Sequence, residues 1–472
     1  MKLSLFRSLM ALAAIWLVGS AGEAVGRAPM QDASSSKPTA FVGVTLLPMT
    51  PSTAHLADHT VIVTGDRITR IGPRASTPIP EGARSIDGTG KYLMPGLADM
   101  HVHLEYTEDP AILRMFLANG VTTVRNMDGR PFIVEWKKRI AAGALLGPAI
   151  HTAGPLLDGD PPLRPDNTVV RTAEAARAAV VAQQAAGYDF IKVYTNLSAD
   201  AYRAVLATAR ERGLTVAGHV PRTITWDEAL TGGQATFEHL SDYDDVLEAD
   251  DSPSRGRYTW FKRFLGMPLD AVKIAAVAQR QAKASTWTVP TLVQADREIA
   301  RPAQVQGWLA SPEMSLIPAE ARAFWQQQVG RSTARMGEDD WALMTKGQAN
   351  RLEVVRALHK AGVHLLAGTD TPNPFVVPGF SLPDELVNFT TAGLTPLEAL
   401  ATSTREAARF LGQLDEWGTV ETGKRSDLVL LDADPLKDIA NVRAISGVMV
   451  RGRWLTAADL KAGLTTLAWT SK

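Results

Sequence analysis

The chain has 472 residues and a formal net charge of -1, with 45% hydrophobic and 21% charged residues. This length suffices for one large domain and a smaller one, and the charge balance argues against a basic surface that binds nucleic acid. Because the sequence has no cysteine, disulfides, thiolate metal sites and a cysteine nucleophile are excluded, and any metal must be held by histidine, carboxylate or lysine-derived groups.

The N-terminus has the three zones of a secretory signal peptide. Lys2 and Arg7 precede an apolar run from about Leu9 to Val18, and small residues follow this run. The run is too short to span a membrane. We therefore expect residues 1–26 to be a signal peptide, with a buried N-terminal helix as the alternative. The mature protein is expected to be periplasmic or secreted, with no membrane association after cleavage.

Short β-rich segments occur near both ends of the chain. On the N-terminal side they are 40–48, 60–64, 68–71, 83–87 and 92–94, and on the C-terminal side they are 418–421, 426–431, 446–450 and 453–455. The pair Gly65-Asp66, between two of these segments, is typical of a tight turn. Two such regions on either side of an α/β middle predict one small composite β-sandwich domain, built from residues 38–93 and 418–472.

Residues 94–417 alternate short apolar strands with helical patterns, such as 173–186, 199–212 and 347–361. The strands are expected at 97–104, 121–127, 149–156, 190–195, 215–220, 235–240, 287–292 and 363–369. This alternation predicts an α/β fold of the (β/α)8 TIM-barrel type. An open doubly wound sheet is the alternative, but no Gly-x-Gly-x-x-Gly turn follows an early strand.

Two of the connections are too long for plain crossovers. They span 242–285 and 293–348, and both carry tryptophans. Both also lie where a barrel builds the rim of its active site. Long insertions at such places are usually functional, so a covering role over the site is expected, with ordinary helix packing of the tryptophans as the alternative.

Chemically active side chains are concentrated at the carboxyl ends of the predicted strands, where a barrel builds its active site. His101 and His103 close the first strand and share a face, because side chains alternate along a strand. His219, His239 and Asp370 close the fifth, sixth and eighth strands. Singly, each could be structural, and Asp370 could cap a helix. Together they predict a metal site, since imidazole is the commonest ligand for zinc-like ions.

Lys192 lies between Ile191 and Val193 inside an apolar strand. A charged amine buried there without a partner would be costly, and burial lowers the pKa of a lysine, which leaves the amine neutral. A neutral amine can add carbon dioxide. The resulting carbamate is a carboxylate that can bridge two metal ions, so Lys192 is predicted to be modified to N6-carboxylysine.

These residues and the motifs around them resemble the amidohydrolase superfamily of metal-dependent hydrolases. The likeness is greatest to its imidazolonepropionase-like branch, which includes secreted or periplasmic Xaa-Pro dipeptidase-type enzymes. The motifs are MPGLADMHVH at 94–103, IKVY at 191–194, GH at 218–219, EH at 238–239, GTD at 368–370, AGLTPLEAL at 392–400 and GKRSDLV at 423–429. They extend over nearly all of the mature chain. One departure from the family's pattern lies in RNMDG at 125–129, after the second strand and near the expected pocket, and it leaves the substrate open.

The resemblance implies two divalent metal ions, most often zinc. The implied ligands are His101, His103, Asp370, His219, His239 and carboxylated Lys192. The first three would hold the more buried ion, the next two the other ion, and the carbamate would bridge both together with a hydroxide. The resemblance also implies that Asp370 accepts the proton of the attacking hydroxide and passes it to the leaving nitrogen. Manganese, cobalt and iron suit the same ligands.

Two further residues are candidates for substrate contact. Tyr194 is two residues beyond Lys192 and should share its face, so its hydroxyl is expected to bind substrate and to act in catalysis by stabilising the oxyanion. Packing at the barrel mouth is the alternative for this tyrosine. His151, within the third strand, is a candidate for substrate binding, with a packing role in the strand as the alternative.

The sequence therefore predicts an exported binuclear hydrolase that cleaves amide or peptide bonds of small-molecule or dipeptide substrates, such as Xaa-Pro dipeptides or N-acyl amino acids. One alternative is a mononuclear cyclic-amide hydrolase of the imidazolonepropionase type. Others are an esterase, lactonase or organophosphate hydrolase at the same site, or a periplasmic binding protein. No nucleic-acid partner is expected. A homo-oligomer is compatible with the fold, because apolar helices on the outside of barrels often pair.

Overall fold

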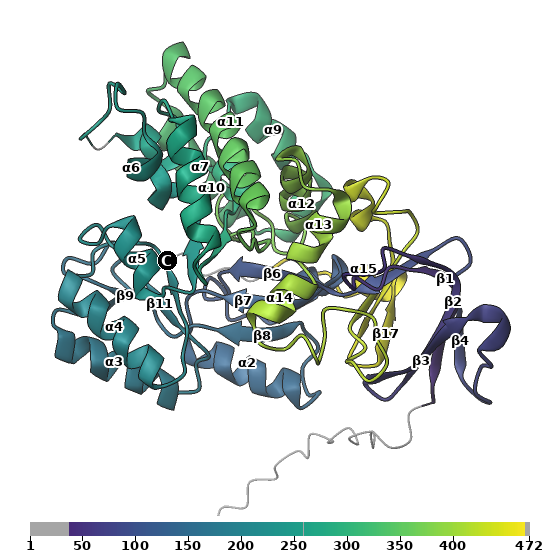
Figure 1. Cartoon of the computed structure of the whole chain (residues 1–472). Coiled ribbons are helices and arrows are strands. Elements are labelled where there is room, and N and C mark those ends of the chain that lie inside the picture. Colours follow the sequence, from purple (N-terminus) through teal and green to yellow (C-terminus); the bar gives the residue numbers. More distant parts are fainter. Residues whose placement is uncertain (1–36, 258, 468–472) are drawn as a thin grey trace, which may run out of the picture. The chain divides into compact units, whose positions relative to one another are not determined.

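The computed structural model describes residues 37–257 and 259–467 (Figure 1). The predicted signal peptide, residues 1–26, lies outside the described residues. Within the described part, no helix combines the length and the apolar character needed to cross a membrane.

Strands from both ends of the chain pair in one eight-stranded sheet, in the order β17-β16-β15-β5-β1-β2-β3, with β4 paired to β1. The strands are β1 Thr39–Leu46, β2 Leu56–Thr64, β3 Arg67–Pro73, β4 Arg84–Asp87, β5 Tyr92–Pro95, β15 Leu428–Leu431, β16 Ile445–Val450 and β17 Arg453–Thr456. The antiparallel pair of β5 and β15 joins the two halves. Buried Phe41, Leu93, Leu430 and Met449 belong to the apolar core of this sheet.

The expected strand at 418–421 is absent, and this segment is irregular. Gly418 has a φ of +93°, which takes the backbone out of the extended conformation. The other expected segments of both chain ends appear as strands. The sandwich architecture and the boundaries of this domain stay predictions.

Parallel strands make up the middle of the chain, in a three-stranded sheet β6-β7-β8 and a six-stranded sheet β10-β9-β11-β12-β13-β14. Their bounds are β6 Leu97–Val102, β7 Val121–Asn126, β8 Ala149–Thr152, β9 Leu157–Asp158, β10 Thr168–Val169, β11 Ile191–Val193, β12 Val216–Gly218, β13 Thr236–Glu238 and β14 Trp287–Val289. The predicted α/β alternation is confirmed. Seven of the eight expected strands are present as ladders, and each of these ends earlier than predicted.

Isolated parallel bridges connect these two sheets. They join Ala153 to Phe190, Thr288 to Leu365, and Val102 to Thr371. The eighth expected strand, 363–369, is present only through such bridges and not as a ladder. A continuous, closed eight-stranded barrel is therefore not observed among the described strands and stays a prediction.

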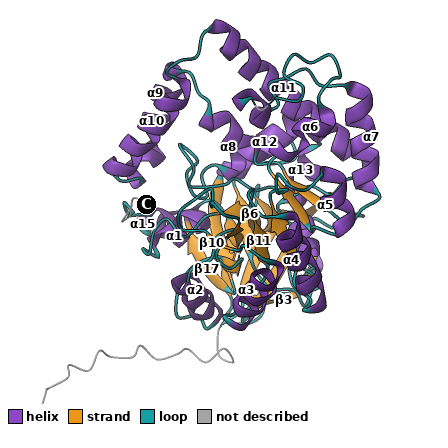
Figure 2. Cartoon of the chain, turned by 90° about the vertical axis from the view of Figure 1, so that its left-hand side faces the viewer, coloured by secondary structure: helices purple, strands orange, loops and turns teal. Residues whose placement is uncertain are grey.

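Helices lie on the outside of the parallel strands (Figure 2). The α-helices are α1 Ala111–Ala118, α2 Pro131–Ala141, α3 Ala173–Ala185, α4 Ala199–Glu211, α5 Trp226–Gly232, α6 Asp244–Leu247, α7 Ala271–Ala282, α8 Leu292–Glu298, α9 Pro302–Leu309, α10 Ala319–Thr333, α11 Glu338–Ala361, α12 Leu382–Thr391, α13 Pro396–Thr402, α14 Arg405–Phe410 and α15 Ala457–Ala462. Short 3-10 helices occur at Arg74–Ser76, Ser241–Tyr243, Trp260–Phe264, Pro312–Leu316 and Ile439–Arg443. Several helices begin at a capping hydroxyl: Thr172, Ser198 and Thr225 each accept from a backbone N–H of the first turn.

Both long connections are largely helical. The first contains α6, the 3-10 helix Trp260–Phe264 and α7, and the second contains most of α8, all of α9 and α10, and the start of α11. In Figure 1 the labelled helices of these connections, α6, α7, α9, α10 and α11, lie above the strands β6 and β7. They therefore occupy one side of the parallel strands, and α10 reaches the site described next.

Candidate metal centre

Two histidines and one carboxylate converge where β6 meets the segment after Leu365. The possible ligand atoms of His101, His103 and Asp370 all lie within 4.8 Å of one another. Asp370 Oδ1 is 3.4 Å from His101 Nε2 and 3.2 Å from His103 Nε2. The three side chains thus present lone pairs to one point, as a metal site requires.

Close backbone contacts hold this cluster in place. The backbone N–H of Asp370 donates to His101 O at 2.8 Å. A Cβ at Gly368 would lie 2.8 Å from the Cβ of His101, so only glycine allows the two segments to approach in this way. Asp370 has a φ of +58° and His239 a φ of +67°. Left-handed backbone is uncommon outside glycine and collects at functional sites.

A second group of predicted ligands lies beside the first. The rings of His219 and His239 are 5.0 Å apart between centroids, and the ring of His239 is 4.8 Å from that of His101. His239 Nε2 lies 3.8 Å from Asp370 Oδ2. One inner cavity of about 90 Å³ is lined by all six predicted ligands: His101, His103, Lys192, His219, His239 and Asp370.

Burial sets the protonation states in this cavity. It lowers the pKa of Lys192 to about 8 and that of His239 to about 3, because the charged forms lose their hydration. Burial would raise the pKa of Asp370, but the imidazoles of His101 and His103 hold it well below its usual range. Burial would lower the pKa of His103, but the carboxylates of Glu105 and Asp370 raise it to about 9. Because metals bind neutral imidazole and ionised carboxylate, a metal ion would displace the proton of His103.

The residues present fit a divalent ion. His101 Nε2 and Asp370 Oδ1 are both buried and have no hydrogen-bond partner among the described atoms. Buried polar atoms in native proteins almost always have a partner, and an ion between these two atoms would provide one. Lys192 is buried and makes no hydrogen bond or ion pair with any described residue. An amine of this kind also fits conversion to a carbamate.

Carboxylates and a hydroxyl orient the histidines from behind. His101 Nδ1 lies 2.7 Å from Glu238 Oε2, and His103 Nδ1 lies 2.9 Å from Glu105 Oε1. His239 Nδ1 lies 2.6 Å from Thr291 Oγ1. Each contact uses Nδ1 and leaves Nε2 for the cavity, which is the arrangement that supports metal-bound histidine.

Two charged residues behind the candidate ligands, Arg125 and Glu238, were not predicted from the sequence to have a role. Arg125 Nη2 donates to Glu238 Oε1 at 2.6 Å, and Arg125 Nε donates to Met100 O at 2.6 Å. Both side chains are buried within short parallel strands. The feature that singled out Lys192, a charged residue in a buried strand, would also have identified this pair.

The two predicted substrate contacts have different outcomes. Tyr194 follows β11 and lines the inner cavity, with its ring 4.6 Å from that of His219. Burial raises the pKa of the Tyr194 hydroxyl, so this hydroxyl is a proton donor at neutral pH.

His151 lines neither of the two cavities described here. It lies near Lys137, Asp189, Arg425 and Gln413, and burial lowers its pKa to about 4. A substrate-binding role for His151 stays a prediction.

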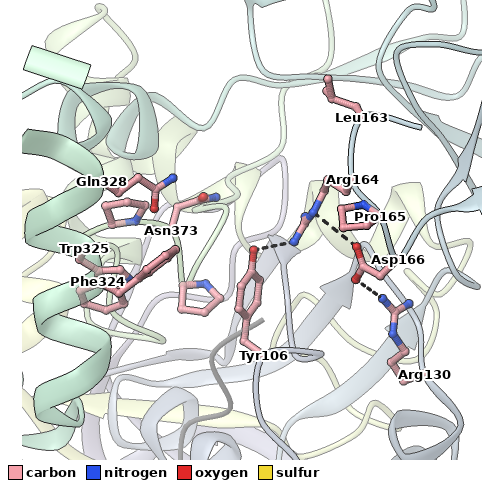
Figure 3. A pocket seen from close by; sticks show the side chains of 12 residues that line it. Tyr106, Arg130, Leu163, Arg164, Pro165, Asp166, Phe324, Trp325, Gln328 and Asn373 are labelled. Carbon is pink, nitrogen blue, oxygen red and sulfur yellow. Dashed lines mark hydrogen bonds and ion pairs between the residues drawn. The ribbon is translucent and has the colours of Figure 1, made fainter. Parts of the chain in front are cut away.

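A larger outer cavity of about 650 Å³ adjoins the inner one (Figure 3). Tyr106, Arg164 and Asn373 line both cavities. Phe324, Trp325 and Gln328 of α10 form one wall of the outer cavity. The second long connection, which was expected to cover the site, therefore supplies part of the approach to it.

Comparisons with known proteins agree with this site. The Amidohydrolase family matches residues 92–455. Imidazolonepropionase of Methylobacterium nodulans is 25% identical over 403 residues, covering 83% of this chain and 91% of that protein. Among solved structures, a bottromycin amidohydrolase has a TM-score of 0.71 and 24% identity, covering 91% of this chain and 90% of its own. A Xaa-Pro dipeptidase with bound methionine in its active site has a TM-score of 0.64 and 19% identity, covering 89% and 100%.

At such identities the solved structures bear on the fold alone, and with the family match they imply the TIM-barrel fold. The family match spans most of the chain. It includes all six candidate ligands that line the inner cavity. The protein belongs to the amidohydrolase family and is a metal-dependent hydrolytic enzyme that acts on carbon–nitrogen bonds.

Proposed function

We propose that the protein is an exported hydrolase that cleaves amide or peptide bonds of small substrates. It is proposed to use two divalent metal ions, with zinc as the expected metal. The observation that carries this proposal is Lys192. Its amine is buried without an ionic partner in a cavity that it shares with His219, His239 and the cluster of His101, His103 and Asp370. A carbamate on this amine would supply the bridging ligand that two ions require.

When bound to these ligands, divalent ions polarise a carbonyl and lower the pKa of water. The side chains of the chain itself supply the remaining functions. Asp370 is ionised and has one carboxylate oxygen without a hydrogen-bond partner, so it can accept a proton from water and deliver it to the leaving nitrogen. Tyr194 borders the same cavity, and its hydroxyl can donate to an oxyanion.

The proposed substrates are dipeptides, including Xaa-Pro dipeptides, and N-acyl amino acids. The size of the outer cavity supports them, because about 650 Å³ is in the range of sites for drug-sized ligands. The main alternative is a mononuclear cyclic-amide hydrolase. It is favoured by the imidazolonepropionase relative and by the three-ligand cluster around Asp370. Ester, lactone or phosphotriester hydrolysis at the same ligands is chemically close to amide hydrolysis.

Two structural proposals accompany this function. The parallel strands are proposed to close into an eight-stranded barrel, which the three isolated bridges between the two sheets support. Export is supported by the charged, apolar and small-residue zones of residues 1–26. Export is tested by fractionating cells that express the full chain and a variant lacking residues 1–26, with only the full chain expected outside the cytoplasm.

The proposed chemistry is tested by metal analysis and turnover together. Protein purified without chelators in bicarbonate buffer should contain about two ions per chain. It should hydrolyse dipeptides or N-acyl amino acids, and lose this activity on metal removal. A single ion with turnover of a cyclic amide, and none of linear amides, would replace this proposal with the mononuclear alternative. Binding of amides without turnover by fully loaded protein would point to a binding protein.

A further inference from the structure

We propose that Arg164 binds the α-carboxylate of the amino acid released by this enzyme, and that the apolar walls of the outer cavity select a hydrophobic acyl group on the other side of the scissile bond. This inference rests on the proposed amide hydrolysis and names its substrate class. The reaction adds water across the amide and breaks the C–N bond. It releases the hydrophobic carboxylic acid, and the leaving nitrogen takes a proton to become the amino group of the free amino acid.

Arg164 is the guanidinium that borders both cavities (Figure 3). It lies in the connection between β9 and β10, and 26% of its side chain is exposed. Its Nη2 donates to the hydroxyl of Tyr106 at 2.8 Å, and its Nε is 4.0 Å from Asp166 Oδ1. Its Nη1 makes no hydrogen bond within the described chain. A guanidinium has five N–H donors, so Arg164 retains a planar set for a carboxylate.

In contrast to Arg164, the neighbouring Arg130 uses both of its terminal nitrogens in hydrogen bonds within the chain. Its Nη1 bonds Asp128 and the carbonyl of Gly129, and its Nη2 bonds Asp128 at 3.0 Å and Asp166 at 2.8 Å. Arg130 therefore satisfies the acidic groups of this wall. Arg164 keeps N–H donors without a partner in the described chain, at the border of both cavities.

The position of Arg164 relative to the metal centre suits an α-carboxylate. The ring of Tyr106, whose hydroxyl accepts from Arg164, lies 6.3 Å from the ring of His103. In an N-acyl amino acid, only the amide nitrogen and the α-carbon separate the carboxylate from the scissile carbonyl. A carboxylate held by Arg164 would therefore keep the amide next to the candidate ligands, and such fixed orientation is a large part of catalysis.

The apolar preference follows from two exposed side chains. Leu163 is 50% exposed and Phe324 is 44% exposed, and both line the outer cavity. Leu163 precedes Arg164 on one wall, and Phe324 lies on the opposite wall beside Trp325 (Figure 3). Pro165 and Pro374 add further apolar surface. Apolar side chains that face each other across a cavity bind apolar groups by excluding water.

The test uses N-hexanoyl-leucine and its carboxamide, N-hexanoyl-leucinamide, as a matched pair with one scissile bond. Wild-type enzyme should prefer the free acid, and Arg164→Gln should reduce this preference about 10- to 100-fold, chiefly through KM, because a hydrogen bond to a charged group is lost. Arg164→Lys, which keeps the charge but not the planar fork, should be intermediate. Equal loss with acid and carboxamide in Arg164→Gln would overturn the assignment.

Two further arginines serve as comparisons. Arg171 is exposed, pairs with Asp160 at 2.7 Å and lines neither cavity, so Arg171→Gln should behave as wild type. Arg263 lines the inner cavity and pairs with Glu298 at 3.0 Å, so Arg263→Gln should keep the preference for the acid. Loss of that preference in Arg263→Gln alone would show that Arg263, and not Arg164, binds the carboxylate.

Absence of turnover of every linear amide by wild-type enzyme would refute the proposed function itself. Equal turnover of acid and carboxamide by wild-type enzyme would refute only the inference.

The apolar wall is tested with N-hexanoyl-leucine and N-acetyl-leucine. Wild-type enzyme should prefer the longer acyl chain in kcat/KM, and Leu163→Ser or Phe324→Ser should reduce this preference about 10-fold. Both side chains are exposed, so neither change should affect folding. An unchanged ratio in both variants would remove the hydrophobic acyl group from the proposed substrate.

Discussion

Glu238 Oε2 lies 2.7 Å from His101 Nδ1, and neither side chain is exposed to solvent. Burial would raise the pKa of Glu238, but Arg125 and His101 hold it well below its usual range, so the carboxylate is ionised. It fixes the tautomer of His101 and leaves Nε2 free to face Asp370. The buried cation of Arg125 therefore compensates a carboxylate that orients a candidate metal ligand.

The first prediction concerns this carboxylate. Glu238→Gln should weaken metal binding about 10- to 100-fold, because contacts behind a ligand tune its basicity and orientation. Metal affinity is measured by competition with a chromophoric chelator. Glu353→Gln, which alters an exposed ion pair with Arg356, should leave the affinity unchanged. If unpaired Arg125 prevents folding of Glu238→Gln, the double variant with Arg125→Met tests the same contact. Wild-type affinity in a folded variant would refute the role of Glu238.

The second prediction concerns metal content. Lys192→Met removes the amine with little change in volume and should reduce the metal content from about two ions to about one per chain, with loss of most activity. Elemental analysis after gel filtration measures the content. Lys262 is the matched control, since it is also buried but pairs with Glu248 at 2.6 Å. Lys262→Met should keep both ions if it folds, and wild-type metal content in Lys192→Met would exclude the carbamate.

The third prediction is a pH dependence of metal-free protein in buffer without carbon dioxide. Burial lowers the pKa of Lys192 to about 8 from its ordinary value of 10.5. Below pH 8 both folded and unfolded chains hold this proton, and the folded state carries the full cost of the buried charge. Between pH 8 and 10.5 the unfolded chain binds more protons, so the free energy of unfolding rises with pH.

Relative to Lys192→Met, wild-type protein should gain about 3 kcal/mol across this window. Urea unfolding at a series of pH values measures the difference between the two proteins, in which the contributions of groups that do not interact with Lys192 cancel. A difference that stays constant or falls from pH 8 to 10.5 would show that the amine is not destabilised by burial.

The strand-end ligands could be predicted from the sequence because the carboxyl ends of parallel strands meet at one edge. His101, His219 and His239 come from β6, β12 and β13 or the residue that follows, and they line one cavity. Alternation along a strand also placed Tyr194 in the same cavity as Lys192.

Other parts of the site depend on tertiary contacts that a sequence pattern does not specify. Arg164 and Phe324 belong to connections whose paths are set by packing against distant elements. The eighth strand lacks a ladder: its segment forms only isolated bridges, at Leu365 and Thr371, and the backbone turns left-handed at Asp370. The pairing of Arg125 with Glu238 required the spatial neighbourhood of β7 and β13, which are not consecutive in the chain.

The fourth prediction concerns the hydroxyl behind His239. Thr291 is buried, and Thr291→Val keeps its shape while removing the oxygen 2.6 Å from His239 Nδ1. The metal affinity of the second group of ligands should fall about 10-fold, because the ring of His239 loses its orienting contact. Stoichiometric titration of metal into stripped protein measures both affinities. Thr291→Ser retains the hydroxyl and should bind as wild type. An effect of equal size in both variants would assign the loss to packing instead.

The last prediction concerns the glycine that makes room for Lys192. Gly218 has a φ of +132°, and a Cβ there would lie 2.1 Å from Val193 O and 3.1 Å from Lys192 Cδ. Gly218→Ala should therefore lower the free energy of unfolding by about 3 kcal/mol, through backbone strain and overpacking, and displace the lysine stem. Gly307 of α9 is the matched control, since a Cβ there meets nothing within 4 Å.

Gly307→Ala should leave stability unchanged or raise it by up to about 1 kcal/mol, because alanine favours the helix. Urea unfolding of the metal-free variants compares the two substitutions without the contribution of bound ions. Metal titration of folded Gly218→Ala then shows whether the displaced lysine stem also weakens the second ion. If both alanine variants unfold at the same urea concentration as wild type, Gly218 does not hold the close approach between β11 and β12, and the position of Lys192 depends on other contacts.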